Sequence, residues 1–537
     1  MTQLPESQEG TAKRGVVATA FPSATPAGLE MLQAGGNAID AAVAAAWALA
    51  VCEPSGSGLG GSTILLIHNP NGRTFLINGQ SCAPAAVSKA TVRRRQQMKG
   101  YRACTVPSTV AALGFAHTRY GLLPLGRVME PAIRLAEEGY AVTPLQRRQQ
   151  RQCLTDLSAH AGARRLFLKD GRPFRKGDVF RQPELAATLR RLALAGTEDF
   201  YRGQIARDIA EHMARVGGLL TQEDLAGAAV PSEGEPVAVG YRDYQVLSTP
   251  PPAGGVQLLF ALKVLEQFSP KDLSGKVDDW YEILAEVIHA VFRERDRLAA
   301  HPSRLAPSFY DRLFGGEHAR EIAMSIRTGR GQSTTGPAAE EPGETTHLCA
   351  ADAQGNVVSL TQSIQSVYGA KVAHGRLGFL YNNYLCTSPR RPHPYQLQSR
   401  CIPRSNAAPT LVLKGDAPRA WGPGSRHRPL LALGAAGSRR ITSSILQVIS
   451  GVLDRGLPLV QAVGAPRVHT TLSRKVHVEK PAATASLLGR LGKRFRAVQV
   501  RSARSFFMGA VQAIQLAEDG SFVGAADPRR DGTAEAW

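Results

Sequence analysis

Two consecutive threonines, Thr345 and Thr346, stand mid-chain at the start of a predicted strand. The stretch before them, residues 327–344 (RTGRGQSTTGPAAEEPGE), has no large apolar residue and is predicted to be a flexible linker. A threonine hydroxyl is a weak nucleophile, but the α-amino group of an N-terminal threonine is a base on the same residue. With a reference pKa of about 7.7–8.0, part of that amine is neutral near pH 7. The pattern suggests cleavage between Glu344 and Thr345, although threonine is also ordinary at a strand start.

Two other patterns carry weaker chemical signals. Residues 56–61 (GSGLGG) fit the dinucleotide-binding pattern G-x-G-x-x-G, but a helix precedes them and a strand follows, which is the reverse of that motif. We interpret them as a tight loop where backbone approaches a core or a ligand. His347 shares a strand face with Thr345, so both a general base and a structural histidine are open for it, with the structural role favoured.

The composition is that of a globular protein, with 43% hydrophobic and 20% charged residues. A formal net charge of +20 raises polyanions as partners. The basic residues are diffuse, and aromatic residues make up only 6% of the chain, which disfavours base-stacking surfaces. We therefore expect no nucleic-acid partner.

Neither a metal site nor a membrane segment is expected. The seven cysteines form no C-x-x-C pair, which favours reduced thiols over a disulfide framework or a zinc site. The start of the chain has no apolar signal region, and the longest apolar run, AIDAAVAAAWALAVCE, contains Asp40 and is interpreted as a buried helix. The expectation is a cytoplasmic protein, with a periplasmic or secreted one as the alternative, and with no membrane partner and no cofactor.

The elements that must position Thr345 fall into two blocks. Residues 105–300 are mostly helical by period, whereas the region after the linker turns to strands such as THLCAAD, NVVSLTQS and APTLVLKG. Helices and strands in separate blocks favour an α+β fold of stacked layers, with a sheet drawing on both sides of the linker.

Ordered motifs along nearly the whole chain resemble the γ-glutamyltranspeptidases, which are N-terminal-nucleophile hydrolases. The segment TTHLCAADAQGNVVSLTQSIQSVYGAKV looks like the opening of their small subunit, and GLEMLQAGGNAIDAAVAAAWALAVCEPSGSGLGG like their N-terminal helix and glycine loop. STPPPAGG, FLYNN, APTLVL, LGAAGSRR and GAADPRRDGTA follow in the family's order.

The resemblance implies a role for particular residues. Thr345 would be the nucleophile, and Ser363 would supply the neighbouring hydroxyl, where the family usually has threonine. Gly437 and Ser438 would provide the backbone N–H groups of the oxyanion hole, where the family usually has Gly-Gly. Thr346 and Thr361 would support the new N-terminus, with ordinary strand packing as the alternative.

The departures from the family lie where it grips glutamate. Gln80 stands at the position of the arginine that binds the α-carboxylate, and Thr387 at that of the aspartate that binds the α-ammonium. The remaining substrate-binding positions fall on Gln365, Tyr384, Ser405 and Asn406. Both formal charges that recognise an α-amino acid are missing.

The resemblance implies a four-layer αββα sandwich built from two chains after autocleavage, a large subunit of residues 1–344 and a small subunit of residues 345–537. The two products would form a heterodimer that acts on a small-molecule amide, such as a γ-glutamyl bond of the glutathione type, and passes the acyl group to water or an amine. One alternative is an amidohydrolase for an oxamate-type or glutaryl amide, as in cephalosporin acylases. Another is a non-enzymatic scaffold.

Overall fold

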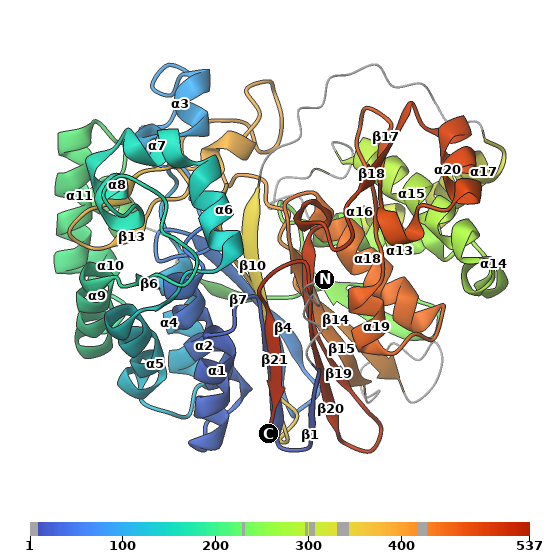
Figure 1. The fold of residues 1–537 in the computed structure, drawn as a ribbon, viewed down its shortest axis with the longest axis horizontal. Coiled ribbons are helices and arrows are strands. Elements are labelled where there is room, and N and C mark those ends of the chain that lie inside the picture. The colour runs from blue at the N-terminus through green and yellow to red at the C-terminus, as the bar shows by residue number, and fades with distance from the viewer. Residues whose placement is uncertain (1–8, 228–230, 296–298, 300–306, 330–342, 416–426) are drawn as a thin grey trace.

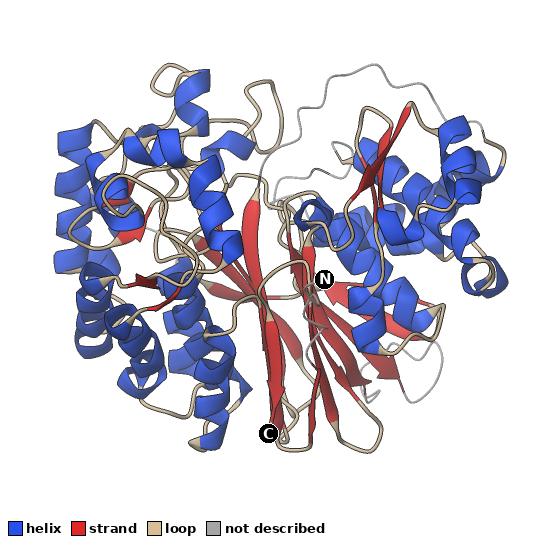
Figure 2. Cartoon of the chain, in the orientation of Figure 1, coloured by secondary structure: helices blue, strands red, loops and turns tan. Residues whose placement is uncertain are grey.

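Two antiparallel sheets pack face to face in the centre of the molecule, and helices cover the outer face of each (Figures 1 and 2). The structure is a computed structural model that describes residues 9–227, 231–295, 299, 307–329, 343–415 and 427–537. The arrangement confirms the predicted α+β fold with four αββα layers. Residues 330–342, most of the predicted linker, lie outside the described ranges.

The first sheet has seven strands in the order β1-β20-β19-β15-β14-β9-β8. Their bounds are β1 Glu9–Ala12, β20 Phe522–Ala526, β19 Ala510–Leu516, β15 His427–Ala436, β14 Thr410–Gly415, β9 Tyr244–Ser248 and β8 Val237–Tyr241.

The second sheet also has seven strands, in the order β21-β2-β10-β11-β3-β4-β7. Their bounds are β21 Thr533–Ala536, β2 Gly15–Thr19, β10 Glu344–Asp352, β11 Val357–Gln365, β3 Ser62–His68, β4 Thr74–Gly79 and β7 Ser232–Gly234. β10 and β11 lie at its centre, and the side chains that they turn toward the first sheet join an apolar core between the sheets.

One helical layer covers the second sheet and shares a core with it. It contains α1 Ala24–Gln33, α2 Ala38–Cys52, α3 Arg94–Met98, α4 Thr109–Tyr120, α5 Leu125–Glu138, α6 Pro144–Gln152, α7 Leu154–Ser158, α8 Ala161–Phe167, α9 Pro183–Ala195, α10 Asp199–Arg202, α11 Gln204–Val216 and α12 Gln222–Ala226. Two short strand pairs, β5 Tyr140–Ala141 with β6 Val179–Phe180 and β12 Ala373–His374 with β13 Phe379–Leu380, lie in the same half.

The other helical layer covers the first sheet and has a core of its own. It contains α13 Gly255–Leu265, α14 Pro270–Ser274, α15 Val277–Glu294, α16 Pro307–Phe314, α17 Glu317–Arg327, α18 Arg440–Leu453, α19 Leu459–Gly464 and α20 Ala485–Arg494. A small sheet of β16 Val468–Thr470, β17 Lys475–Glu479 and β18 Ala497–Arg501 accompanies them.

Helix α2 shows why the longest apolar run is a core helix. Asn37 accepts hydrogen bonds from the backbone N–H groups of Ile39 and Asp40, and Asp40 accepts one from Asn37, which is a capping box. Every residue from Ala38 to Cys52 is buried, as the sequence predicted. Within the described ranges, no helix has the length and apolarity needed to cross a bilayer.

The predicted division at Thr345 cuts across both sheets. Residues before it supply β1, β8 and β9 to the first sheet and β2, β3, β4 and β7 to the second. Five strand pairings join the two pieces: β1–β20, β9–β14, β2–β10, β3–β11 and β2–β21. Separating the pieces would leave unpaired strand edges in both sheets.

We expect neither piece to fold alone. When 1–344 and 345–537 are expressed as separate chains, each should be insoluble or lack a cooperative unfolding transition, because each lacks the partner strands of both sheets. Co-expressed, the pieces should co-purify and melt together, which size exclusion and circular dichroism would measure. A 345–537 fragment that unfolds cooperatively on its own would contradict this interdependence.

Candidate active site

A register shift at the start of β10 brings Ser363 to Thr345. The β10–β11 ladder pairs Thr346 with Gln362, but the next pair is Glu344 with Gln365, so β11 carries one extra residue opposite Thr345. Such a bulge re-aims side chains. Gln365, at the end of the bulge, has φ +80°, and its backbone N–H donates to Ser363 Oγ at 2.9 Å.

The hydroxyl of Ser363 connects Thr345 with the peptide bond that precedes it. Thr345 Oγ1 lies 3.2 Å from Ser363 Oγ, and Ser363 Oγ donates to the carbonyl oxygen of Glu344 at 2.8 Å. A serine hydroxyl has one proton and two lone pairs. Because that proton goes to the Glu344 carbonyl, Thr345 is the donor in its bond with Ser363. The side chains of both residues are buried.

Arg530 places two carboxylates beside Thr345. Its guanidinium bonds Glu53 Oε1 at 3.0 Å, pairs with Glu344 Oε1, and donates to the carbonyl oxygen of Thr345 at 3.1 Å. All three charged side chains are buried. Glu344, predicted as the end of a flexible linker, is instead the first residue of β10, held by this ion pair.

The two carboxylates share one positive charge. Burial raises the pKa of the Glu53 carboxyl from 4.5 to about 7; Arg530 opposes this rise, and the nearby Glu344 carboxylate adds to it. Thr346 Oγ1 is buried and has no hydrogen-bond partner among the described residues, so its expected support of the new N-terminus stays a prediction. Burial would lower the pKa of Arg530, but Glu344 and Glu53 outweigh it and raise that pKa.

A second buried ion cluster fixes the loop that carries Arg530. Arg529 bonds Glu479 through Nε at 2.9 Å and Asp527 through Nη1 at 3.1 Å. Arg467 pairs with the other oxygen of Asp527 at 2.6 Å. The cluster therefore anchors the chain one residue before Arg530.

The glycine loop packs against the same end of β10 and β11. Ile364 donates its N–H to the Gly56 carbonyl at 3.1 Å. A Cβ on Gly61 would lie 2.4 Å from the Ser363 carbonyl oxygen, and one on Gly56 would lie 3.3 Å from the Glu344 side chain. The interpretation of residues 56–61 as a close-approach loop is confirmed.

Gly437 and Ser438 form a turn between β15 and α18. Both have positive φ, +124° and +56°, and their carbonyls accept the first N–H bonds of α18. A Cβ on Gly343 would lie 2.5 Å from Ser438 Cβ, so the turn contacts the chain just before the candidate cleavage site. Ser438 adopts the left-handed conformation that glycine usually supplies.

Asn406 connects to this turn. Its Nδ2 donates to Ser438 Oγ at 3.4 Å, and its Oδ1 accepts from Arg295 Nη2 at 3.0 Å. These bonds use one of the two N–H donors and one of the two oxygen lone pairs of the Asn406 amide. Asn406 therefore lies beside Ser438, and its contact with a substrate stays a prediction.

Tyr384 and Ser405 lie with Ser363. Burial raises the pKa of the Tyr384 phenol, while the hydroxyls of Ser363, Ser62 and Ser405 around it act to lower that pKa. Ser405 also donates its backbone N–H to the Pro252 carbonyl at 3.0 Å. The structure thus brings these predicted substrate-binding residues to the nucleophile.

Gln80 and Thr387 differ in whether their side-chain donors already have hydrogen-bond partners. The Thr387 hydroxyl lies 2.8 Å from the carbonyl oxygens of both Tyr384 and Arg404, so its single proton is used by the backbone. The Gln80 side-chain nitrogen is buried and has no hydrogen-bond partner among the described residues. Neither residue supplies a charge.

His347 and Thr361 bond each other rather than Thr345. Thr361 Oγ1 lies 2.9 Å from His347 Nδ1, and burial lowers the pKa of His347 to about 3. A Cβ on Gly434 would lie 2.2 Å from the ring, so the imidazole fills space between the sheets. A neutral histidine packed this way fits the structural role, and Thr361 supports it rather than the strand start.

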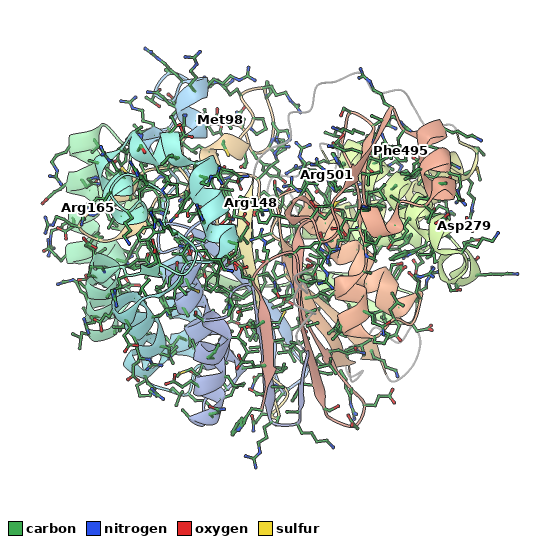
Figure 3. All side chains as sticks on the ribbon, in the orientation of Figure 1. Met98, Arg148, Arg165, Asp279, Phe495 and Arg501 are labelled. Atoms are coloured by element: carbon green, nitrogen blue, oxygen red, sulfur yellow. The ribbon has the colours of Figure 1, made fainter. Side chains whose placement is uncertain are left out.

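Two phenylalanine rings near Arg530 each lie against a pair of arginines. Arg148 and Arg530 both lie over the Phe506 ring, each 5.0 Å from its centroid. Arg440 and Arg501 lie over Phe507 at 4.8 and 4.0 Å. Figure 3 shows Arg148 and Arg501 on opposite sides of the midline, one from each helical half.

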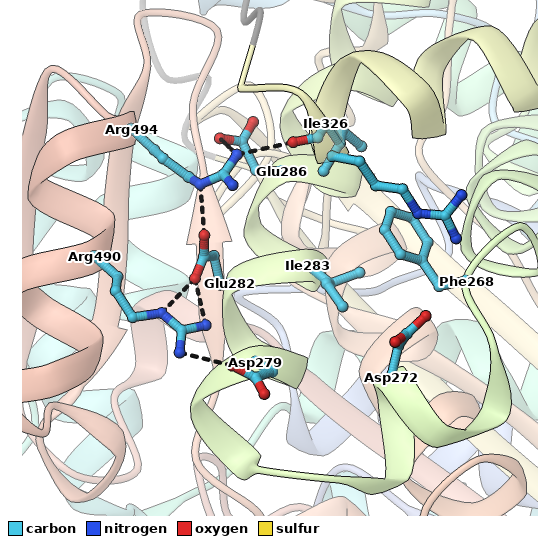
Figure 4. Close-up of a pocket in the computed structure, with 10 residues that line it drawn as sticks. Phe268, Asp272, Asp279, Glu282, Ile283, Glu286, Ile326, Arg490 and Arg494 are labelled. Carbon is cyan, nitrogen blue, oxygen red and sulfur yellow. Dashed lines mark hydrogen bonds and ion pairs between the residues drawn. The ribbon is translucent and has the colours of Figure 1, made fainter.

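A separate pocket of about 260 Å³ lies between α15, α17 and α20 (Figure 4). Its charges neutralise one another, since Arg490 pairs with Asp279 at 2.6 Å and Arg494 with Glu282 at 2.5 Å. None of the predicted site residues lines it. Among the residues that the structure describes, no His, Cys, Asp and Glu side chains group as metal ligands would.

Sequence reasoning missed Glu53, Gln149 and Arg530. Gln149, on α6, donates to Glu344 Oε2 at 3.2 Å. A signal existed for Glu53, a carboxylate directly after a helix that is apolar apart from Asp40, since a buried carboxylate must find a partner. Arg530 stands in a segment quoted only for its family resemblance, and Gln149 in a stretch for which the sequence predicted no function.

The raised pKa of Glu53 predicts how the free energy of unfolding depends on pH. Because the folded pKa of Glu53, about 7, exceeds its ordinary 4.5, the folded protein binds the proton more tightly, and stability falls as pH rises from about 4.5 to 7. In the uncleaved variant Thr345→Ala, Glu53→Gln should remove a pH-dependent loss on the order of 3 kcal/mol. Chemical unfolding at pH 5 and pH 8 measures it; equal pH dependence with and without Glu53→Gln would refute it.

Known proteins match this chain along its length. The family model for γ-glutamyltranspeptidase matches residues 24–537. A glutathione hydrolase proenzyme from Escherichia coli is 33% identical over 546 residues, covering 96% of this chain and 91% of that protein. The Acylase ACY 1 proenzyme of a Pseudomonas species is 34% identical over 552 residues, covering 98% and 94%.

A solved structure is also similar to this chain along its whole length. The crystal structure of cephalosporin acylase from Bacillus halodurans superposes with a TM-score of 0.89 at 30% identity, covering 100% of this chain and 98% of that one. The family model extends across the strand that begins at Glu344 and the C-terminal loop that holds Arg530. The chain belongs to the γ-glutamyltranspeptidase family.

Proposed function

We propose that this protein is a proenzyme that cleaves itself between Glu344 and Thr345 and then acts as an N-terminal-threonine amidohydrolase and acyltransferase. The observation that carries the proposal is the Ser363 hydroxyl, which accepts from Thr345 Oγ1 and donates to the Glu344 carbonyl oxygen. The nucleophile and the carbonyl that it must attack are thus joined by one side chain. The proenzyme names of both relatives agree with it.

This bond chain supplies a proton path for self-cleavage. As Thr345 Oγ1 attacks the Glu344 carbonyl carbon, its proton passes to Ser363 Oγ, and the Ser363 proton passes to the carbonyl oxygen. The tetrahedral intermediate is neutral, so no base outside the bond chain is required. Loss of the C–N bond, with a proton delivered to the nitrogen, leaves an ester on Thr345. Water hydrolyses it to a Glu344 carboxylate and a free Thr345 amine.

The mature enzyme repeats this chemistry on an external amide. The Thr345 amine takes the proton of Oγ1 as the oxygen attacks, and returns it to the departing amine. We assign the oxyanion to the backbone N–H groups of Gly437 and Ser438, which lie at the turn beside residue 343. Water or a second amine then takes the acyl group from the ester.

The two products stay together as a heterodimer of 1–344 and 345–537. Five strand pairings hold them, and none uses the cleaved peptide bond. Cleavage therefore opens the site without dismantling either sheet.

For the substrate, we propose an acyl group that keeps a carboxylate but lacks the α-ammonium, such as a glutaryl amide. A zwitterionic head group needs a partner of each sign, and Gln80 and Thr387 supply neither charge. The Thr387 hydroxyl is also occupied by backbone. One relative is named a glutathione hydrolase and another an acylase, so both substrate classes occur among related proteins.

Self-cleavage is tested with variants of the nucleophile, Thr345, and of Ser363, which passes on its proton. Wild-type protein should resolve into two fragments on a denaturing gel, with the smaller beginning Thr345-Thr346-His347 by Edman sequencing. Thr345→Ala should abolish cleavage, and Ser363→Ala should slow it at least tenfold because the proton path is broken. Thr345→Ser keeps the hydroxyl and should still mature, which makes it the matched control. A Thr345→Ala protein that still matures would rule out the mechanism, and an intact, inactive wild-type chain would favour the scaffold alternative.

Substrate choice is tested with paired anilides. Each missing charged partner removes about 1.5–3 kcal/mol, so two predict a γ-glutamyl kcat/KM roughly a hundred- to ten-thousandfold below that of an enzyme with both charges. The matured protein should turn over glutaryl-p-nitroanilide faster than γ-glutamyl-p-nitroanilide, with oxamate as a third substrate. Faster γ-glutamyl turnover would show that other residues replace the missing charges.

A further inference from the structure

The side chain of Glu344 occupies a closed, polar pocket next to the nucleophile. Its carboxylate pairs with Arg530 through Oε1, accepts from Gln149 Nε2 at 3.2 Å through Oε2, and accepts from the Thr345 N–H at 3.1 Å through Oε1. Glu344, Gln149 and Arg530 are all buried. The pocket is therefore built around a carboxylate, which charge-assisted hydrogen bonds hold strongly.

Glu344 is also the acyl group of the self-cleavage reaction. From its carbonyl carbon, the chain runs through Cα, Cβ and Cγ to the carboxyl carbon Cδ. A glutaryl group has the same skeleton, an acyl carbon and a carboxyl carbon separated by three carbons. The ester that forms on Thr345 Oγ1 during maturation is thus a glutaryl ester with an amino substituent next to the acyl carbon.

We propose that the Glu344 pocket, once cleavage frees it, binds the terminal carboxylate of a five-carbon dicarboxylic acyl donor, with Arg530 and Gln149 as its specificity-determining residues. The inference rests on the proposed function, since it needs the Thr345 ester. The precursor's own scissile residue is then a template for the external substrate. The carboxylate is gripped from the C-terminal loop and α6, not from the position of Gln80.

The charge balance around Arg530 suits a returning carboxylate. In the precursor Arg530 serves two anions, Glu53 and Glu344. When Glu344 leaves, Arg530 keeps Glu53 but loses the partner on Nη2, and Gln149 Nε2 loses its acceptor. Buried donors without acceptors cost free energy, so a carboxylate that reaches both is favoured.

The pocket should also discriminate between acyl groups by the length of their carbon chain. A succinyl group is one carbon shorter and does not reach as far as the Glu344 carboxylate, while an adipyl group is one carbon longer and must fold. An oxalyl group has no carbon between its two carboxyl carbons. We therefore expect glutaryl donors to exceed succinyl and adipyl donors, and oxamate to gain nothing from this pocket.

The first test compares acyl lengths on wild-type protein that has fully matured. The p-nitroanilides of succinate, glutarate and adipate, and of pentanoate as the five-carbon neutral analogue, are assayed for kcat/KM. The glutaryl compound should exceed each of the others about tenfold or more, because it alone places a carboxylate where a charge-assisted hydrogen bond can form. Equal values for glutaryl and pentanoyl compounds would overturn the proposal.

The second test changes one pocket residue that does not touch Thr345. In Gln149→Leu, the ratio of glutaryl to pentanoyl kcat/KM should fall about tenfold. Gln152→Leu, on an exposed position of the same helix, is the matched control and should leave that ratio unchanged. A general structural defect lowers both substrates together, so an unchanged ratio in Gln149→Leu would overturn the assignment of Gln149.

The third test measures how changes in the Glu344 side chain affect the rate of maturation. Glu344→Asp shortens the native side chain by the carbon that separates glutaryl from succinyl, and Glu344→Gln removes its charge. Both should mature more slowly, and the Asp variant should rank below wild type as succinyl ranks below glutaryl. Unchanged maturation in both variants would overturn the proposal. Failure of the proposed function looks different, because wild-type protein would then neither cleave nor turn over any anilide.

Discussion

A single buried guanidinium holds the candidate active site together. Arg530 contacts Glu53 at the end of α2, Glu344 at the start of β10, and the backbone of Thr345. These groups come from three distant parts of the chain, and all of the charged side chains are buried. Because a buried charge without its partner is costly, the three segments take up their positions together or not at all. The positions of Thr345 and Ser363 therefore depend on all three segments being in place.

The neighbouring arginine extends the constraint to the rest of the fold. Arg529 turns to Glu479 and Asp527, and so ties the C-terminal loop to β17 and to the layer that carries α18. Shortly after Arg530 the chain enters β21, which pairs with β2 at the edge of the second sheet. One short loop thus joins both sheets, both helical layers and the nucleophile, through interactions that are mostly ionic.

Local patterns in the sequence predicted much of the fold. The long apolar run predicted α2 as a buried helix, and the strand-like segments after Thr345 predicted β10 and β11. Thr345 itself followed from the chemistry of an N-terminal threonine, strengthened by the resemblance. Glu344 was misplaced because Gly, Pro and acidic neighbours are typical of linkers, and only a partner 186 positions away in the chain buries it. The orientation of Asn406 likewise depends on Arg295 and Ser438, which are distant in the sequence.

The sharing of strands across residue 345 has a consequence for how long the enzyme lasts. In an intact chain the 1–344 and 345–537 segments find each other as parts of one molecule, at the high effective concentration that a linker gives. Under the proposed cleavage before Thr345 that help is lost, and unfolding would release two chains whose strand edges are open to aggregation. The mature protein would then rarely return to the folded state. Its lifetime is set by the height of its unfolding barrier, so selection acts on an unfolding rate rather than on an equilibrium.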